Sequence, residues 1–168
     1  EAKKQHVLCS MEVIKSRTTD FSTDGFVRDY LEMIHRGRNL KKGVTARLKN
    51  PLLKNKLPLN NYLKAILVVD KHGRVVSSTQ KDLQGKDISD QEVFLQGISK
   101  GYGQVCVYQP HRSPFFDANC ICVAAPVLSK HDSEQLGVII NVYHLSTLNN
   151  ITTNRIGMGE TGEVYLVN

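Results

Sequence analysis

Five short apolar runs between Tyr62 and Leu145, rich in β-branched residues, constrain the fold of this 168-residue chain more than any other feature. The first two, AILVVD (65–70) and RVVSST (74–79), flank the turn KHG and predict a β-hairpin. Short turns also separate the later runs, and strands joined by short turns pair antiparallel. The sequence therefore predicts one antiparallel sheet. The remaining runs are QVCVYQ (104–109), CICVAAPVLS (120–129) and LGVIINVYHL (136–145).

Helical periodicity dominates the residues before this sheet. Residues 1–17 carry one apolar stripe, and a second helix is expected from Phe26 to Gly37 after the cap-forming residues 18–24. A weaker helical stretch covers 39–49. Within 82–101 a short helix is expected between the second and third strands, capped by Ser89 or Asp90, with Val93, Phe94 and Ile98 facing inward. The predicted fold class is α+β: N-terminal helices, then a five-to-six-stranded antiparallel sheet with a helix and loops over one face.

The positive charge of the chain is concentrated near its beginning. The net charge is +6, but residues 1–56 hold 13 basic and 6 acidic side chains, whereas the rest is slightly acidic. Such a segment suits nucleic acid, anionic lipid head groups or a plain solvated helix surface. No stretch reaches the roughly 18 apolar residues of a membrane span. The first residues, EAKKQ, read as the middle of a helix, so we expect the chain to be a piece of a longer protein.

Sequence motifs of catalysis are missing from the chain. It contains no GxSxG, phosphate-binding loop, HExxH or GxGxxG pattern. Three of its histidines, His72, His111 and His131, fall in expected turns, where a solvated imidazole is the ordinary finding. We therefore expect no catalytic residue, no cofactor and no enzymatic activity in this domain.

Three of the four cysteines fall on expected strands. Cys120 and Cys122 are two residues apart and share a face of their strand. If Gln109 lies opposite Asn119, Cys106 lies opposite Cys122. That register leaves three possibilities open: a cross-strand disulfide, a three-thiolate metal site, or small buried thiols in a sheet core. We expect no metal site, because the spacing of the thiols is looser than closed zinc sites use.

The segment YQPHRSPFFDAN (108–119) is the strongest candidate for ligand binding. It combines aromatic side chains with a few polar donors, the mixture that orients small polar ligands in pockets. Arg112 can grip a carboxylate through paired charge-assisted hydrogen bonds. On the last strand, Asn141 and Tyr143 share a face, although parity does not say which one. The predicted ligand-binding residues are Tyr108, His111, Arg112, Phe115, Phe116, Asn119, Asn141 and Tyr143.

Several segments together resemble the double Cache domain, a PAS-like extracytoplasmic sensor of prokaryotic histidine kinases, chemoreceptors and diguanylate cyclases. They are VVDKHGRVVSST, GKDISDQEVFLQGIS, VAAPVLS, LGVIINVYHLSTL and GMGETGEVYLVN, in this order, over roughly residues 20–168. Amino-acid-binding members carry an Arg-x-Trp-Tyr element and an Asp on the last strand. This chain has no Trp and no Asp in VIINVYHL, which weakens an amino-acid ligand and leaves a carboxylate or another small anion open.

The resemblance implies three regions. Residues 1–58 would hold the signalling helix and shorter helices, 59–150 the membrane-distal PAS-like ligand-binding domain, and 151–168 a crossover with the first strand of a reduced or truncated membrane-proximal unit. It also implies an extracytoplasmic location and a membrane tether in the full-length protein. A homodimer through the N-terminal helix fits the same picture.

The main functional hypothesis is a sensory domain that binds a small molecule and signals across the membrane to a cytoplasmic output domain, a histidine kinase in the first instance. The alternative is a basic module that binds nucleic acid or an acidic partner through residues 1–56. No nucleic-acid-binding motif accompanies that basic segment, so the sensory hypothesis expects no nucleic-acid partner.

Overall fold

The computed structural model describes residues 2–37, 52–59, 62–108, 115 and 119–144. Two helices, α1 (Ala2–Thr23) and α2 (Gly25–His35), precede two short helical turns, η1 (Leu52–Lys56) and η2 (Leu57–Leu59). A five-stranded sheet follows. Its strands are β1 (Leu63–Asp70), β2 (Val75–Ser78), β3 (Cys106–Tyr108), β4 (Cys120–Leu128) and β5 (Gln135–His144), with η3 (Lys81–Leu83) and α4 (Glu92–Ile98) between β2 and β3.

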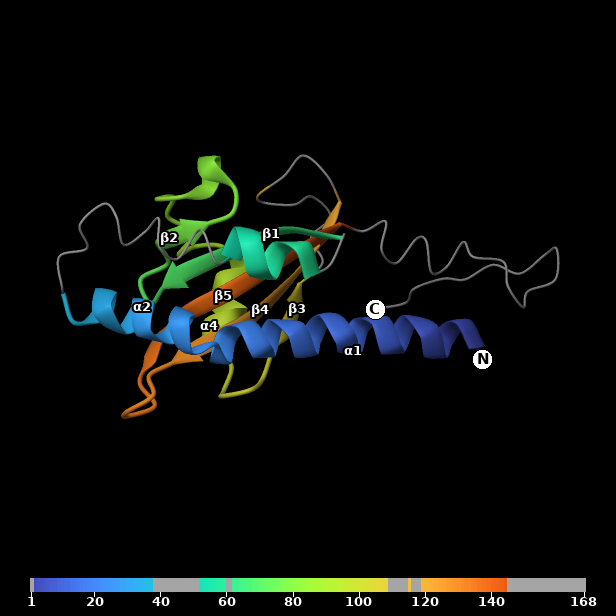
Figure 1. Cartoon of the computed structure of the whole chain (residues 1–168), viewed down its shortest axis with the longest axis horizontal. Coiled ribbons are helices and arrows are strands. Elements are labelled where there is room, and N and C mark those ends of the chain that lie inside the picture. The colour runs from blue at the N-terminus through green and yellow to red at the C-terminus, as the bar shows by residue number, and fades with distance from the viewer. Residues whose placement is uncertain (1, 38–51, 60–61, 109–114, 116–118, 145–168) are drawn as a thin grey trace.

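The sheet has the strand order β2-β1-β5-β4-β3, and each of these four pairs of neighbours runs antiparallel. The predicted α+β class and antiparallel sheet are therefore confirmed. β5 lies at the centre, although it comes last of the five in the chain. Figure 1 shows α1 lying along the sheet, with its N-terminal part extending beyond the strands.

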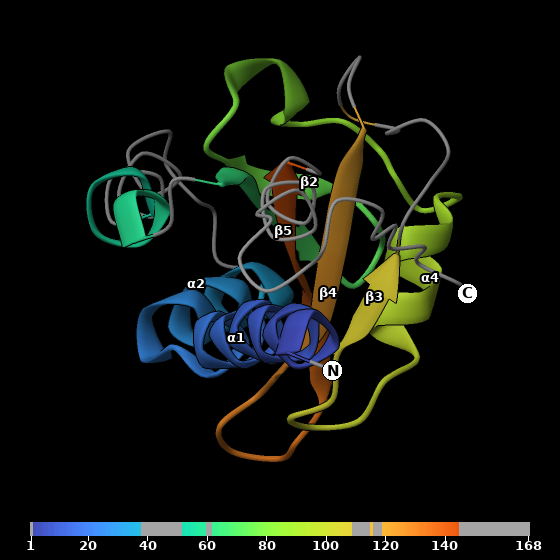
Figure 2. The same ribbon diagram turned by 90° about the vertical axis from the view of Figure 1, so that its right-hand side faces the viewer.

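Both faces of the sheet are covered, and side chains alternate between two hydrophobic cores. Figure 2 shows α1 and α2 on one side of the strands and α4 on the other. The first core joins the two helices to side chains such as Ile121, Val123 and Ile139. The second core joins η3 and α4 to side chains such as Cys122, Ala124 and Ile140. The helix and loops that the sequence predicted over one face are thus the cover of the second core.

Helix α1 continues to Thr23, six residues past the predicted end at residue 17. The stretch that follows is rich in residues that commonly cap helices. Here their hydroxyls bond backward instead: Thr18 Oγ1 donates to the carbonyl of Ile14 and Thr23 Oγ1 to that of Thr19. Such backward bonds let Thr remain inside a helix.

The predicted start of the second helix is confirmed by its cap. Asp24 Oδ1 accepts from the backbone amides of Phe26 and Val27, and Asp24 Oδ2 pairs with Lys56 Nζ at 2.8 Å. The Lys56 ammonium also lies 4.5 Å from the centre of the Phe21 ring. One carboxylate therefore caps α2 and fastens η1 to the α1–α2 corner.

Substituting Asp24 by alanine should cost roughly 1–2 kcal/mol of unfolding free energy, the usual value of an N-cap. Burial alone would raise the pKa of Asp24, but Lys56 and the two backbone amides outweigh it and lower the pKa. This stabilisation is therefore present above the unfolded pKa and is lost as pH falls through the lower folded pKa. Urea unfolding at neutral and acidic pH should show that the difference in unfolding free energy between wild type and Asp24→Ala becomes smaller in acid. A difference that does not change with pH would contradict this role.

Two local predictions were wrong. Neither Ser89 nor Asp90 caps α4, whose N-cap is Gln91 without a side-chain cap bond. In the hairpin of β3 and β4, Cys106 lies opposite Ala124 and Tyr108 opposite Cys122, a register two residues away from the predicted one. A shift of two residues keeps each side chain on its predicted face. The predicted helix at 39–49 lies outside the described residues.

Candidate functional site

The second face of the sheet gathers the three strand cysteines with part of the predicted binding segment. Cys106, Cys120 and Cys122 belong to one core with Val93 and Phe94 of α4. Tyr108 and Phe115 pack against the same core and are half-buried. The edge strand β3 places Tyr108 directly opposite Cys122 on β4. An aromatic and sulfur-rich corner therefore lies beneath the point where residues 109–118 join the sheet.

The other predicted residues fall into two groups. Asn119 is exposed and immediately precedes β4, next to this corner in sequence. His111, Arg112 and Phe116 lie outside the described residues, so their positions relative to Tyr108 and Phe115 stay a prediction. Asn141 and Tyr143 lie on the opposite face of the sheet, toward α1. The structure thus brings Tyr108 and Phe115 together and separates them from Asn141 and Tyr143.

The described cysteines are free thiols. Burial raises the pKa of Cys106, and burial together with the nearby thiols of Cys120 and Cys106 raises the pKa of Cys122 to about 12. Among the described residues, no group of three His, Cys, Asp or Glu side chains is placed to hold a metal ion. Of the three possibilities that the sequence left open, the arrangement of the strand cysteines matches small buried thiols in a sheet core.

A thiol titration tests this arrangement. Cys9 is exposed on α1, whereas the three strand cysteines are buried. Because thiolates are the reactive form, the folded chain should react quickly with Ellman's reagent at one thiol per chain and at all four only after unfolding. Cys9→Ser should remove the fast phase. Only two reactive thiols in the unfolded, unreduced chain would instead reveal a disulfide.

A buried polar contact joins α1 to the central strand. Asn141 Nδ2 donates to Thr18 Oγ1 at 3.1 Å and approaches the Tyr143 hydroxyl at 3.4 Å. Thr18 and Asn141 are fully buried, and the Asn141 Oδ1 atom has no hydrogen-bond partner within the described part of the chain. Burial raises the pKa of Tyr143, which hydrogen bonds with Thr18 and Asn141 only partly offset. We call Thr18, Asn141 and Tyr143 the α1 contact.

The alternation of β5 explains why sequence reasoning missed the α1 contact. Asn141 pairs with Ile66 of β1 and Val123 of β4, at the middle of the sheet. Its neighbours along the strand, Ile140 and Val142, face the second core. The one signal available in the sequence was an Asn within an otherwise apolar central strand. A buried amide needs a partner, and the Thr-rich end of α1 supplies it.

Three of the 13 basic side chains in residues 1–56 form described pairs with acidic ones. Lys15 pairs with Glu12 at 2.9 Å, Arg36 with Glu32 at 2.6 Å, and Lys56 with Asp24. Among the described residues, no helix combines the length and apolar character needed to cross a membrane.

The chain is similar in structure to several solved sensor domains. It matches the sensor domain of the Vibrio cholerae histidine kinase DctB with a TM-score of 0.72 and 18% identity, covering 92% of this chain and 56% of that one. It matches the Escherichia coli DcuS sensor domain with a TM-score of 0.58 and 17% identity, covering 90% and 98%. It matches the ligand-binding domain of the Pseudomonas aeruginosa chemoreceptor PctC, solved with GABA, with a TM-score of 0.52 and 14% identity, covering 88% of this chain and 67% of that one.

No family model matches the sequence, and no curated protein is similar to it. The chain spans about half the length of the DctB sensor domain. These similarities confirm the fold that the sequence resemblance implied, the PAS-like fold of Cache sensor domains.

Proposed function

We propose that this chain, which has the PAS-like fold of Cache sensor domains, is the extracytoplasmic sensory domain of a membrane receptor. It binds a small molecule and passes the signal through α1 to a cytoplasmic output domain, of which a histidine kinase is the first candidate. Solved domains of similar structure belong to histidine kinases and a chemoreceptor. The proposed domain is itself not an enzyme.

The observation that carries this proposal is the α1 contact. A helix that reports on a sheet needs a connection that responds to small shifts of the strands. The hydrogen bond from Asn141 to Thr18 is such a connection, because it is buried and its length and direction depend on the position of β5. The N-terminal part of α1, in which Leu8 and Cys9 are exposed, extends beyond the sheet and can carry a displacement outward (Figure 1).

The proposed ligand site lies on the second face, at the segment from Tyr108 to Asn119. Tyr108 and Phe115 supply aromatic surface there. Arg112 is proposed to bind a carboxylate or another small anion, with His111, Phe116 and Asn119 beside it. Asn141 and Tyr143 face α1, and we propose that they transmit the response and do not touch the ligand. In this arrangement the sheet lies between the proposed ligand site and α1, the helix that responds to ligand binding.

The mechanism is a shift between two populations of the domain. A ligand favours the state that it binds more tightly, and the shift cannot exceed this difference in affinity. Strands β4 and β5 are shared by both cores, so a change on the second face alters the register or tilt of the strands that hold the α1 contact. Coupling between the two faces is then reciprocal: fixing α1 changes the ligand affinity equally.

Two further parts of the proposal concern the full-length protein. The first is a homodimer through α1. Leu8 and Val13 are 50% and 49% exposed, but they are five residues apart and point to different sides of the helix, so each would need apolar neighbours from the partner helix on its own side. Residues 151–168 are proposed to begin a second, membrane-proximal unit.

The competing function, a basic module for nucleic acid, is less well supported because Lys15, Arg36 and Lys56 are already paired with carboxylates.

A thermal-shift screen of small carboxylates and amines tests the proposal, since a ligand that binds only the folded state raises Tm. At least one carboxylate is expected to stabilise the chain, and Arg112→Ala should abolish that stabilisation. Arg74→Ala, which alters an exposed arginine of the β1–β2 turn, is the matched control and should leave the hit unchanged. If every carboxylate that stabilises the wild type still stabilised Arg112→Ala, the anion-binding role of this segment would be contradicted.

A further inference from the structure

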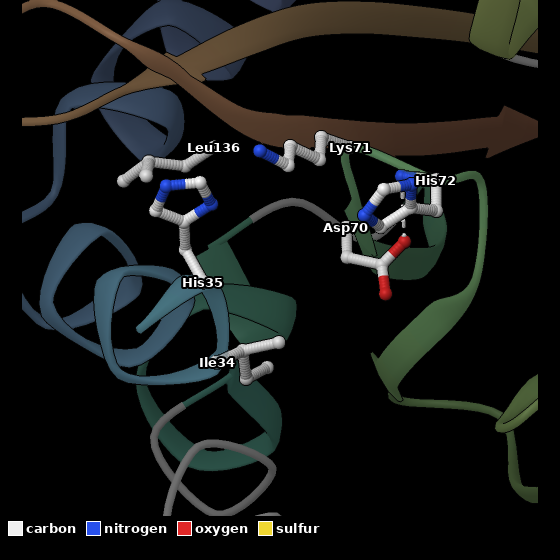
Figure 3. A pocket seen from close by; sticks show the side chains of 6 residues that line it. All are labelled: Ile34, His35, Asp70, Lys71, His72 and Leu136. Carbon is white, nitrogen blue, oxygen red and sulfur yellow. Dashed lines mark hydrogen bonds between the residues drawn. The ribbon is translucent and has the colours of Figure 1, made fainter. Parts of the chain in front are cut away.

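A cavity of about 270 Å³ lies where the C-terminal end of α2, the β1–β2 turn and the start of β5 meet (Figure 3). Six of the described residues line it: Ile34, His35, Asp70, Lys71, His72 and Leu136. Strand β5 begins here, whereas Cys120, which follows the 108–119 segment, pairs with His144 at the far end of β5. The cavity therefore lies at the opposite end of the sheet from the site proposed above, and goes beyond that function.

A bulge between β4 and β5 and the turn between β1 and β2 form the walls of the cavity. Between β4 and β5 the pairing passes from Val127–Gly137 to Leu128–Gln135, so Leu136 is the extra residue of a bulge. A bulge redirects a side chain, and Leu136 joins the core on the α2 side. In the β1–β2 turn, Asp70 Oδ1 accepts from the amides of His72 and Arg74, which holds Lys71 and His72 in place.

Gly73 makes this turn possible. Its φ is +87°, and a Cβ added there would lie 2.4 Å from the Cα of Ser89. The turn therefore packs tightly on the loop before α4 and presents Lys71 on its other side. A fixed turn, not a mobile loop, supplies the basic groups of the cavity.

The imidazole of His35 is held from one side only. Its Nε2 lies 3.0 Å from Glu134 Oε2, and Lys71 Nζ lies 3.4 Å from Oε1 of the same carboxylate. The buried Nδ1 has no hydrogen-bond partner among the described residues. Figure 3 shows one ring nitrogen of His35 turned toward the side of the cavity where Lys71 and Asp70 lie. With Nε2 bonded to Glu134, Nδ1 is the ring atom left to bind a guest.

We propose that this cavity binds a small monocarboxylate with a short aliphatic chain. One carboxylate oxygen accepts from Lys71 Nζ and the other from protonated His35 Nδ1, while Glu134 stabilises the resulting imidazolium through Nε2. Ile34 and Leu136 provide the apolar surface for the chain. The volume suits a ligand of a few carbon atoms, because it lies at or below the lower end of ordinary ligand pockets.

The charges around the cavity set the selectivity. Among the described lining residues, three basic groups, His35, Lys71 and His72, face one carboxylate, Asp70, whose Oδ1 accepts from two amides of the turn. The remaining charge of Asp70 repels a second negative group, so a dicarboxylate is disfavoured. On α2, Arg36 is paired with Glu32, and across the cavity Glu134 faces His35 and Lys71.

A titration of the full chain with sodium butyrate, followed by the imidazole nitrogen signals in NMR, tests the proposal. Butyrate should shift the Nδ1 signal of His35 and leave that of exposed His131 unchanged. Succinate and butylamine should bind at least about tenfold more weakly than butyrate, since each places a charge against a like charge.

Two variants and two controls complete the test. His35→Ala and Lys71→Met should each weaken butyrate binding by about tenfold or more, because each removes a charge-assisted hydrogen bond. His131→Ala and Lys86→Met, at exposed positions outside the cavity, should leave it unchanged. Arg112→Ala should also leave it unchanged, which separates this site from the one proposed above. Butyrate binding that is insensitive to His35→Ala and Lys71→Met, preference for butylamine, or no binding would overturn the proposal.

Discussion

Gly137→Ala is expected to destabilise the chain by about 3 kcal/mol or more, a large fraction of the stability of an ordinary domain. Gly137 lies on the central strand, between Asp70 of β1 and Val127 of β4. A Cβ there would lie 2.0 Å from the carbonyl oxygen of Val69 and 3.1 Å from the Cα of Asp70. Both obstacles are backbone atoms of a paired strand, so relief requires moving β1 away from β5.

Urea unfolding measures this effect, with Gly101→Ala as the matched control. A Cβ at Gly101 would meet only the flexible side chain of Gln104, at 3.5 Å. We expect the control to stay within about 0.5 kcal/mol of wild type. A Gly137→Ala variant that unfolds within about 1 kcal/mol of wild type would show that the β1–β5 pairing is looser than described.

Thr18→Val is expected to cost about 1–3 kcal/mol of unfolding free energy. The change preserves shape but removes the hydroxyl that accepts from Asn141 Nδ2. The amide of Asn141 is fully buried and would keep only its long contact with Tyr143 at 3.4 Å. The loss is thus the desolvation of an amide left without a good partner.

A double-mutant cycle separates the contact itself from other effects of the substitution. Thr18→Val, Asn141→Leu and the double variant should give a coupling energy of about 1 kcal/mol or more. Thr19→Val is the matched control, because Thr19 Oγ1 likewise bonds backward, to the carbonyl of Lys15, but does not reach the sheet. A coupling below about 0.3 kcal/mol would mean that α1 and β5 are held together by apolar packing alone.

The strands were predictable because apolar alternation and turn chemistry agree along most of this chain. The runs around Val68, Val123 and Ile139 each became a strand, and Asp24 became the cap of α2. Periodicity does not reveal which face of a strand meets which helix. Asn141 and Tyr143 were therefore assigned correctly to one shared face, but the sequence could not show that this face meets α1.

Bulges and contacts between distant parts of the chain could not be predicted from the sequence. The extra residue Leu136 interrupts the two-residue period of β5, and only the pairing with β4 shows it. The cavity beside His35 combines α2, the β1–β2 turn and β5, which are far apart in the chain. The β3–β4 register was wrong by two residues because side chains return to the same face every two residues and β4 is apolar throughout, so both registers bury the same faces.

The claim that the sheet passes a signal from one face to the other is tested most directly by the backbone amide signals of α1 in NMR. A carboxylate that stabilises the wild type but not Arg112→Ala would be added to the full chain until saturation. The account predicts that Thr18 and Ile14 shift together with β4 and β5, and that Thr18→Val reduces the shift of Ile14. Saturation with changes confined to the surroundings of Tyr108 and α4, and none in α1, would contradict it.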